Sequence, residues 1–133
     1  MKRVIVIEDD PVNARMMKAL LERRGGWSVL HTESGDELFD LARRGEVALA
    51  LLDVSLGSTS WNGRPVTGLE LSRALKSDAA TRAIPVVITS AHAMRGDAER
   101  FLRDSLAEDY VAKPITDHAA FVARLRNWLG EAA

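Results

Sequence analysis

The chain contains no cysteine among its 133 residues, and this absence excludes disulfide bonds, thiolate chemistry and cysteine-type zinc sites. It also contains no long apolar run: none approaches the roughly 20 residues of a membrane span, and the run after Met1-Lys2-Arg3 is too short for a signal peptide. The formal net charge of −1 gives no general attraction to nucleic acid or to an anionic membrane. We therefore expect a cytoplasmic protein without a direct nucleic-acid or membrane partner.

Short apolar runs alternate with amphipathic stretches along the whole chain, which is long enough to bury one core. The amphipathic stretches carry apolar residues at helical spacing, so the pattern predicts five β/α units in a single domain, residues 1–133. Such an alternation predicts an α/β fold, a parallel sheet with helices on both faces. The predicted strands are Val4–Ile7, Trp27–Leu30 (at an edge), Val47–Leu52, Val86–Thr89 and Tyr110–Ala112.

Each predicted helix begins at a residue whose side chain can accept hydrogen bonds from the N–H groups of the first turn. Asp10 precedes a proline, and both Ser34 and Thr67 are followed three residues later by Glu, as in a capping box. For the last two helices we expect the caps to be Asp97 and Thr116.

Three carboxylates follow the predicted strands: Glu8, Asp9 and Asp53. Open α/β sheets place their sites at the carboxyl ends of strands, so the three would converge if the first and third strands are neighbours. Such a cluster must take up protons or bind a cation, and oxygen ligands that leave room for water suit Mg²⁺. The alternative is that each residue is only a solvated loop residue or a helix cap.

Ser90 and Lys113 also close predicted strands, so they would lie on the same rim as the carboxylates. A hydroxyl and an ammonium beside a metal-binding carboxylate are suited to a phosphoryl group, because phosphoryl transfer depends on positioning and charge neutralisation. Taken singly, each could be an ordinary strand-end hydroxyl or a surface lysine.

Four segments together resemble the receiver domain of two-component response regulators. They are Val-Ile-Glu-Asp-Asp-Pro at 6–11, Leu-Leu-Asp at 51–53, Ile-Thr-Ser-Ala at 88–91 and Tyr-Val-Ala-Lys-Pro at 110–114. The resemblance covers almost the whole chain and is closest to stand-alone, single-domain receivers, so no output domain is expected. It implies a flavodoxin-like, doubly wound five-stranded parallel sheet with strand order 2-1-3-4-5.

The resemblance implies a role for each matching position. Asp53 would accept the phosphoryl group, while Ser90 and Lys113 would each contact one of its oxygens. Mg²⁺ would be bound by Asp9 directly, by Glu8 with the help of water, by Asp53, and by the backbone carbonyl of Ser55. Tyr110 would be the switch aromatic, turning inward when Ser90 is drawn to the phosphate, and the Lys113-Pro114 bond would be cis.

The function implied is a phosphorylation-activated signalling switch. A histidine kinase or a histidine phosphotransfer protein would supply the phosphoryl group, and the fourth helix, fifth strand and fifth helix would carry the signal. The only catalysis expected is self-catalysed phosphorylation and dephosphorylation of the aspartate, in a monomer or a phosphorylation-dependent dimer. The alternative is a degenerate receiver that acts as a phosphorylation-independent interaction module. An aspartyl phosphatase is disfavoured because Ser55 stands where that class has a second Asp.

The segment after Asp53 departs from the family pattern. The connection to the third helix is longer than usual by about seven residues, and long irregular loops are usually functional or mobile. Its Trp61 could belong to a lid over the site, or the segment could be a surface insertion with Trp61 folded onto the neighbouring helix. His92, two residues after Ser90, could modulate the lifetime of the phosphoryl group, or it could be a solvent-facing loop residue. We assign no role to the other two histidines, His31 and His118.

Overall fold

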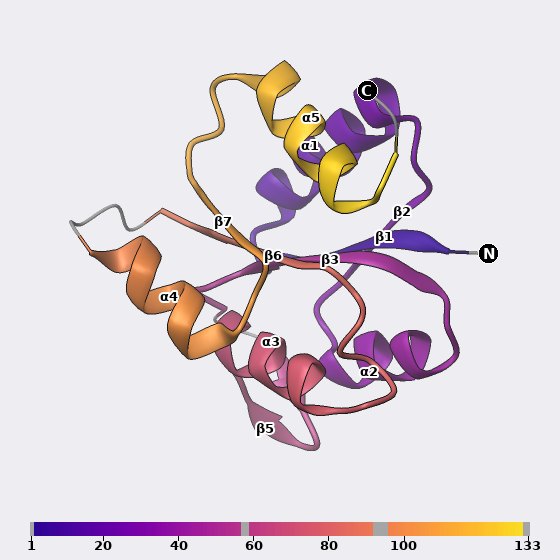
Figure 1. Ribbon diagram of the computed structural model, residues 1–133, viewed down its shortest axis with the longest axis vertical. Helices are drawn as coiled ribbons and strands as arrows, with labels where there is room; N and C mark the ends of the chain where they lie inside the picture. The colour runs from indigo at the N-terminus through magenta and orange to yellow at the C-terminus, as the bar shows by residue number, and fades with distance from the viewer. Residues whose placement is uncertain (1, 57–58, 92–95, 132–133) are drawn as a thin grey trace.

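The computed structural model of the chain describes residues 2–56, 59–91 and 96–131. Its main sheet has five parallel strands in the order β2-β1-β3-β6-β7 (Figure 1). This is the predicted order 2-1-3-4-5, because the fourth and fifth predicted strands are β6 and β7. The strands are β1 (Arg3–Ile7), β2 (Val29–Thr32), β3 (Val47–Asp53), β6 (Val86–Ser90) and β7 (Asp109–Ala112), with a separate hairpin of β4 (Ser60–Trp61) and β5 (Arg64–Pro65).

Helices cover both faces of the sheet, as predicted. Figure 1 shows α1 and α5 on one face and α2, α3 and α4 on the other. No helix in the described part of the chain is long and apolar enough to cross a bilayer. The helices are α1 (Pro11–Leu20), continued by the π-helical turn η1 (Leu21–Gly25), then α2 (Gly35–Arg43), α3 (Gly68–Ser77), α4 (Asp97–Ser105) and α5 (His118–Trp128).

Side chains of the central strands alternate between two apolar cores. In β3, Ala50 and Leu52 pack in the core under α2, α3 and α4, whereas Leu49 and Leu51 pack in the core under α1 and α5. Because strand side chains alternate with a period of two, Asp53 belongs to the same face as Leu51. The sheet therefore directs this carboxylate to the face covered by α1 and α5.

Three of the five predicted helix caps are confirmed. Asp10 accepts hydrogen bonds from the N–H groups of the first turn of α1, and Ser34 accepts one from the N–H of Glu37. Thr67 and Glu70 form the complete capping box, each side chain accepting from the backbone N–H of the other. These local signals succeed because both partners of each cap lie within three residues.

The other two predicted caps, Asp97 and Thr116, are wrong by one residue. Gly96 precedes α4 with a left-handed φ of 86°, so Asp97 is already helical and pairs with Arg100 at 2.9 Å. Asp117 caps α5, its carboxylate accepting a first-turn N–H. Asp and Thr can both cap a helix, but the path of the incoming chain puts Gly96 and Asp117 at the two boundaries.

The second strand lies at the edge of the sheet as predicted, but it is shifted from Trp27–Leu30 to Val29–Thr32. Trp27 packs elsewhere: its ring lies 5.2 Å from the guanidinium of Arg126, and its Nε1 donates to the carboxylate of Glu131 at 3.0 Å. Its apolar and polar contacts therefore join the start of β2 to the end of the chain.

The segment 54–67, predicted to be irregular, contains the β4-β5 hairpin. Its turn residues Asn62 and Gly63 have φ values of 54° and 76°, the left-handed backbone that two-residue hairpin turns require. The half-buried ring of Trp61 stacks on Phe39 of α2, with ring centroids 4.6 Å apart and planes 11° apart. This position agrees with the surface-insertion alternative, in which Trp61 folds onto the neighbouring helix.

Helix α3 begins at Gly68, directly against the end of β3. A Cβ atom at Gly68 would lie 1.9 Å from the carbonyl oxygen of Asp53. We expect Gly68→Ala to lower the free energy of unfolding by about 3 kcal/mol, the upper range for overpacking, because backbone atoms must shift. Urea unfolding of the purified variant measures this.

Gly45→Ala is the matched control. Gly45 has a φ of 74°, but no atom of the described residues lies within 4 Å of the position that a Cβ would take. Only the left-handed backbone then opposes the methyl group, and we expect the free energy of unfolding to fall by about 1 kcal/mol. Equal losses in the two variants would show that the contact with Asp53 does not constrain α3.

Candidate functional site

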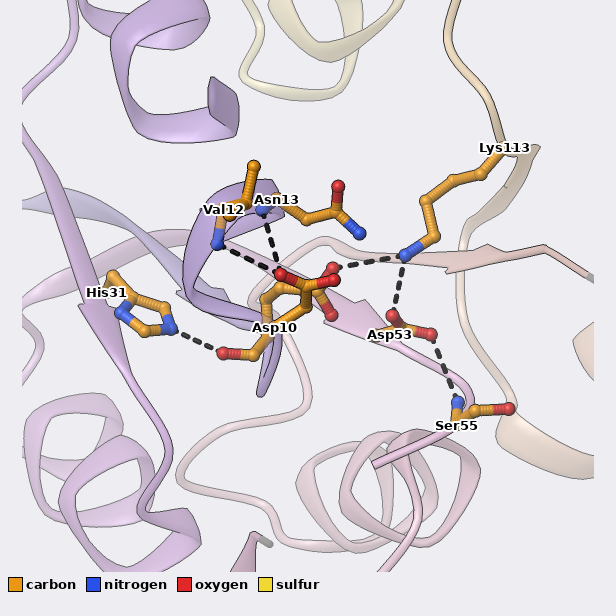
Figure 2. Close-up of polar contacts among 8 residues, drawn as sticks. Asp10, Val12, Asn13, His31, Asp53, Ser55 and Lys113 are labelled. Atoms are coloured by element: carbon orange, nitrogen blue, oxygen red, sulfur yellow. Dashed lines mark hydrogen bonds and ion pairs between the residues drawn. The ribbon is translucent and has the colours of Figure 1, made fainter. Parts of the chain in front are cut away.

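Three of the predicted site residues meet at the carboxyl ends of the strands. Glu8 follows β1, Asp53 ends β3 and Lys113 follows β7. The Nζ atom of Lys113 lies 2.6 Å from Oδ2 of Asp53 and 3.1 Å from Oε1 of Glu8. Figure 2 shows the lysine reaching Asp53, and it does so from the end of β7, which β6 separates from β3. The two carboxylates come from adjacent strands and share one ammonium group.

The second oxygen of the Asp53 carboxylate is held by the backbone. The N–H of Ser55 donates to Oδ1 at 3.0 Å, and the N–H of Val54 donates to the carbonyl of Thr89 at 2.8 Å, which fixes the start of the loop. Asp53 is only 8% exposed. Its carboxylate is therefore oriented at both oxygens, by the Ser55 N–H at Oδ1 and by Lys113 at Oδ2.

The two carboxyl groups have opposite protonation preferences. Burial and the adjacent Asp53 raise the pKa of Glu8 to about 7, although Lys113 opposes this. Burial opposes ionisation of Asp53, but its hydrogen bonds with Glu8 and Lys113 and the Ser55 N–H hold its pKa below the usual value. Burial likewise opposes charge on Lys113, but both carboxylates keep its pKa above the usual value. Near neutral pH, Asp53 is the ionised carboxylate and Glu8 is poised to give up a proton.

One carboxylate oxygen of Glu8 is suited to bind a metal ion. Its Oε2 atom is buried and has no hydrogen-bond partner within the described residues. Among those residues, no three acidic or histidine side chains are preassembled as a metal-binding group. Mg²⁺ commonly keeps several waters and uses only one or two carboxylates, so this oxygen-only site fits it. Glu8, Asp53 and the carbonyl of Ser55 are suitable ligands.

The other predicted residues lie in the turn after β1 and on β6 and β7. Asp9 is half-buried in the turn between β1 and α1. Ser90 is buried at the end of β6, where its carbonyl accepts from the N–H of Lys113 at 2.8 Å, and the predicted cis bond before Pro114 is present. Tyr110 lies on β7, its ring 5.9 Å from that of Phe101 of α4.

Two predicted modulators are not part of this group. Trp61 of β4 stacks on Phe39 of α2 and packs against the core on that face, whereas Asp53 belongs to the other face. His92 lies outside the described residues.

A cavity of about 450 Å³ opens beside the site, between the sheet and helices α1 and α5. Asp53 and Lys113 form part of its wall, as does Thr89, which pairs with Asp53 in the β3-β6 register and which sequence reasoning overlooked. The sequence signal for Thr89 is weak because its neighbour Ser90 is also a strand-end hydroxyl. The remaining wall is mostly apolar and includes Met16, Met17, Leu20, Leu51 and Ile115.

His31, which received no role from the sequence, contacts this site. Its Nε2 atom lies 2.5 Å from the carbonyl oxygen of Glu8. His31 is on β2, opposite Val6 in the register of the sheet. The contact depends on which residues face each other across two strands, and nothing in the spacing of the sequence reports that.

Comparison with known proteins identifies the same family in a family model and in related sequences. Residues 4–126 match the family model of the response regulator receiver domain. The polar-differentiation response regulators DivK of Brucella ovis and Brucella anthropi are 37% and 36% identical over 131 residues, 98% of this chain and 98% of theirs.

Solved structures show the same fold. The receiver domain of the sensor histidine kinase PA1611 from Pseudomonas aeruginosa, with a magnesium ion coordinated in its active-site cleft, is 26% identical, with a TM-score of 0.78 over 98% of this chain and 100% of that one. The BeF3-activated N-terminal receiver domain of RstA from Klebsiella pneumoniae is 25% identical, with a TM-score of 0.74 over 95% and 97% of the two chains.

The raised pKa of Glu8 makes stability depend on pH. Between about pH 5 and 7 the folded protein keeps a proton on Glu8 that the unfolded chain has released. The free energy of unfolding should therefore fall as the pH rises through this interval, with a limiting slope of about 1.4 kcal/mol per pH unit. Asp53, with its lowered pKa, contributes stability that is lost only as the pH falls below this interval. Urea unfolding without Mg²⁺ at several pH values measures the slope.

Glu8→Gln should make the free energy of unfolding less dependent on pH between about pH 5 and 7, and should raise it near pH 7, because the amide carries no charge to bury. The exposed Glu22→Gln should retain the wild-type slope. If Glu8→Gln keeps that slope as well, the proton is bound elsewhere.

Proposed function

The chain belongs to the response regulator receiver domain family of two-component signalling, and we propose that it is a switch that accepts a phosphoryl group on Asp53 in the presence of Mg²⁺. The donor would be a phosphohistidine of a histidine kinase or a histidine phosphotransfer protein. The observation that carries this proposal is the buried Asp53 carboxylate, which is oriented by the Ser55 N–H and by Lys113.

The transfer step follows from this geometry. A carboxylate oxygen of Asp53 forms a bond to phosphorus while the bond from phosphorus to the donor imidazole nitrogen breaks, and the released imidazole takes up a proton. Lys113 is charged and able to contact a phosphoryl oxygen, because its ammonium already lies 2.6 Å from the attacking group. Mg²⁺, bound by Glu8, Asp9, Asp53 and the Ser55 carbonyl, would neutralise charge on the phosphoryl oxygens.

Access to Asp53 favours a protein donor with an apolar contact surface. Val12 and Met16 of α1 are 54% and 64% exposed, so together they give this helix a small apolar surface. They stand one helical turn apart, and Met16 also lines the cavity beside Asp53. An amphipathic helix of the donor could cover both while presenting its phosphohistidine to the site.

The outgoing signal would use the edge of the sheet at β7 and the helices on either side of it. Ser90 and Ile88 lie two residues apart on β6, so they share a face, and Ile88 pairs with Tyr110 on β7. A phosphoryl group that draws in the hydroxyl of Ser90 would alter the space next to Tyr110. Tyr110 contacts Phe101 of α4, and its backbone carbonyl accepts from Arg124 of α5 at 3.1 Å, so α4, β7 and α5 would form the surface that phosphorylation reshapes. The phosphoryl group biases this surface only by its different affinity for the two arrangements.

Phosphorylation of Asp53 is tested with a small acyl phosphate and Mg²⁺. We expect intact-mass measurement to show one added phosphoryl group, and beryllofluoride with Mg²⁺ to shift amide signals of Lys113 and Tyr110. Asp53→Asn should abolish both effects because an amide is neither a nucleophile nor an anion. Asp40→Asn, on the exposed side of α2, should retain them. An adduct that survives in Asp53→Asn would exclude Asp53 as the acceptor, and no adduct in the wild type would favour a phosphorylation-independent interaction module.

The hairpin provides a second test. Replacing residues 58–65 with a short turn should leave the phosphorylation and dephosphorylation rates within about twofold, because Trp61 packs on Phe39 and not over Asp53. The same replacement should lower the melting temperature, since it removes the aromatic stack. Trp61→Ala is the control that keeps the loop length. Rates that change with loop removal, but not with Trp61→Ala, would restore a lid function for the segment.

A further inference from the structure

His31 is a half-buried side chain of the edge strand β2 that reaches toward the acidic turn after β1. Its Nε2 atom contacts the Glu8 carbonyl oxygen. A carbonyl only accepts, so Nε2 must carry the proton of this hydrogen bond. The contact extends the pairing of β1 with β2 beyond the last backbone pair, Ile7 with Thr32, by means of a side chain.

The acidic turn is held from both ends. His31 binds the carbonyl of Glu8, and the carboxylate of Asp10 accepts from the N–H groups of Val12 and Asn13 at 2.9 and 3.4 Å (Figure 2). Asp9 lies between these two fixed points. The directions of the Glu8 and Asp9 side chains are set by the peptide planes that flank them, so a donor on the Glu8 carbonyl fixes the plane that both share.

We propose that His31 is a positioning residue for Mg²⁺, fixing the Glu8–Asp9 peptide so that both carboxylates are directed at the metal beside Asp53. This proposal rests on the proposed function. Outer contacts that orient metal ligands commonly change metal affinity by about 10- to 100-fold. His31 is suited to this role because its ring is held by the sheet and not by the loop that it orients.

The experiment compares the wild type with His31→Ala, which removes the donor, and His31→Gln, whose amide nitrogen can replace it. Ser28→Ala, an exposed change just before β2, is the matched control. The dissociation constant of Mg²⁺ is measured by NMR titration of amide signals. We expect His31→Ala to weaken Mg²⁺ binding about 10-fold, and His31→Gln to restore most of the loss, with Ser28→Ala at the wild-type value.

A second measurement needs no metal. The Asp9 N–H belongs to the same peptide group as the Glu8 carbonyl, so its ¹⁵N signal reports the hydrogen bond from His31. This signal should move in metal-free His31→Ala further than in Ser28→Ala, and return toward the wild-type position in His31→Gln.

The outcomes separate this proposal from the proposed function. Equal Mg²⁺ affinity in the wild type and His31→Ala, or an unmoved Asp9 signal, would overturn the positioning role while leaving Asp53 phosphorylation intact. A wild type that binds no Mg²⁺ would overturn the metal-dependent function, and with it the role of His31 toward the metal. Loss of affinity in both His31 variants would show that the bulk of the ring matters and would also overturn the hydrogen-bond proposal.

Discussion

The ammonium group of Lys113, shared by the carboxylates of Glu8 and Asp53, is the interaction on which the arrangement of this site depends. Two like charges about 4 Å apart repel by about 4 kcal/mol at the effective dielectric near a protein surface, so the pair needs a cation or a proton. Lys113 supplies part of that charge from the edge strand, and a proton on Glu8 can supply more. The result is an unequal pair in which Asp53 is the ionised group, the protonation state that the proposed phosphoryl transfer needs.

This contact is possible only because of the sheet register. The carboxyl ends of parallel strands meet at one edge, and alternation brings Glu8, Asp53 and Lys113 to the same face as Val6, Leu51 and Val111. A slip of one residue in β3 would exchange Leu51 for Leu52 in the core and turn Asp53 to the other face. The two apolar cores thus specify the position of a polar site that they do not themselves contain.

The long connection after Asp53 is accommodated without disturbing that site. Gly68 brings the start of α3 within contact distance of the Asp53 carbonyl, which leaves no space for extra chain between them. The additional residues therefore form a hairpin to one side. There Trp61 stacks on Phe39, and the Asn62 N–H donates to Asp36 at 3.1 Å, so α2 carries the insertion.

The sequence by itself determined the elements whose signals are local or repeated along the chain. Buried strands were visible as apolar runs, three helix starts as caps with partners within three residues, and the carboxylates of the site as polar residues at strand ends. The family motifs then assigned Asp53 and Lys113 to one site, although 60 residues separate them, and the structure added their direct contact. Where a residue next to the boundary was also able to cap, as with Asp97 and Thr116, local signals were insufficient.

Only the tertiary structure decided the contacts between residues that are distant in sequence and unremarkable in composition. Trp27 lies outside β2, where it contacts Arg126 and Glu131, and Trp61 stacks on the ring of Phe39. His31 reaches Glu8 because β2 pairs with β1 in one particular register. The physical reason is the same in each case: a side chain's partner is set by the packing of whole elements, and a single sequence carries no local record of which elements become neighbours.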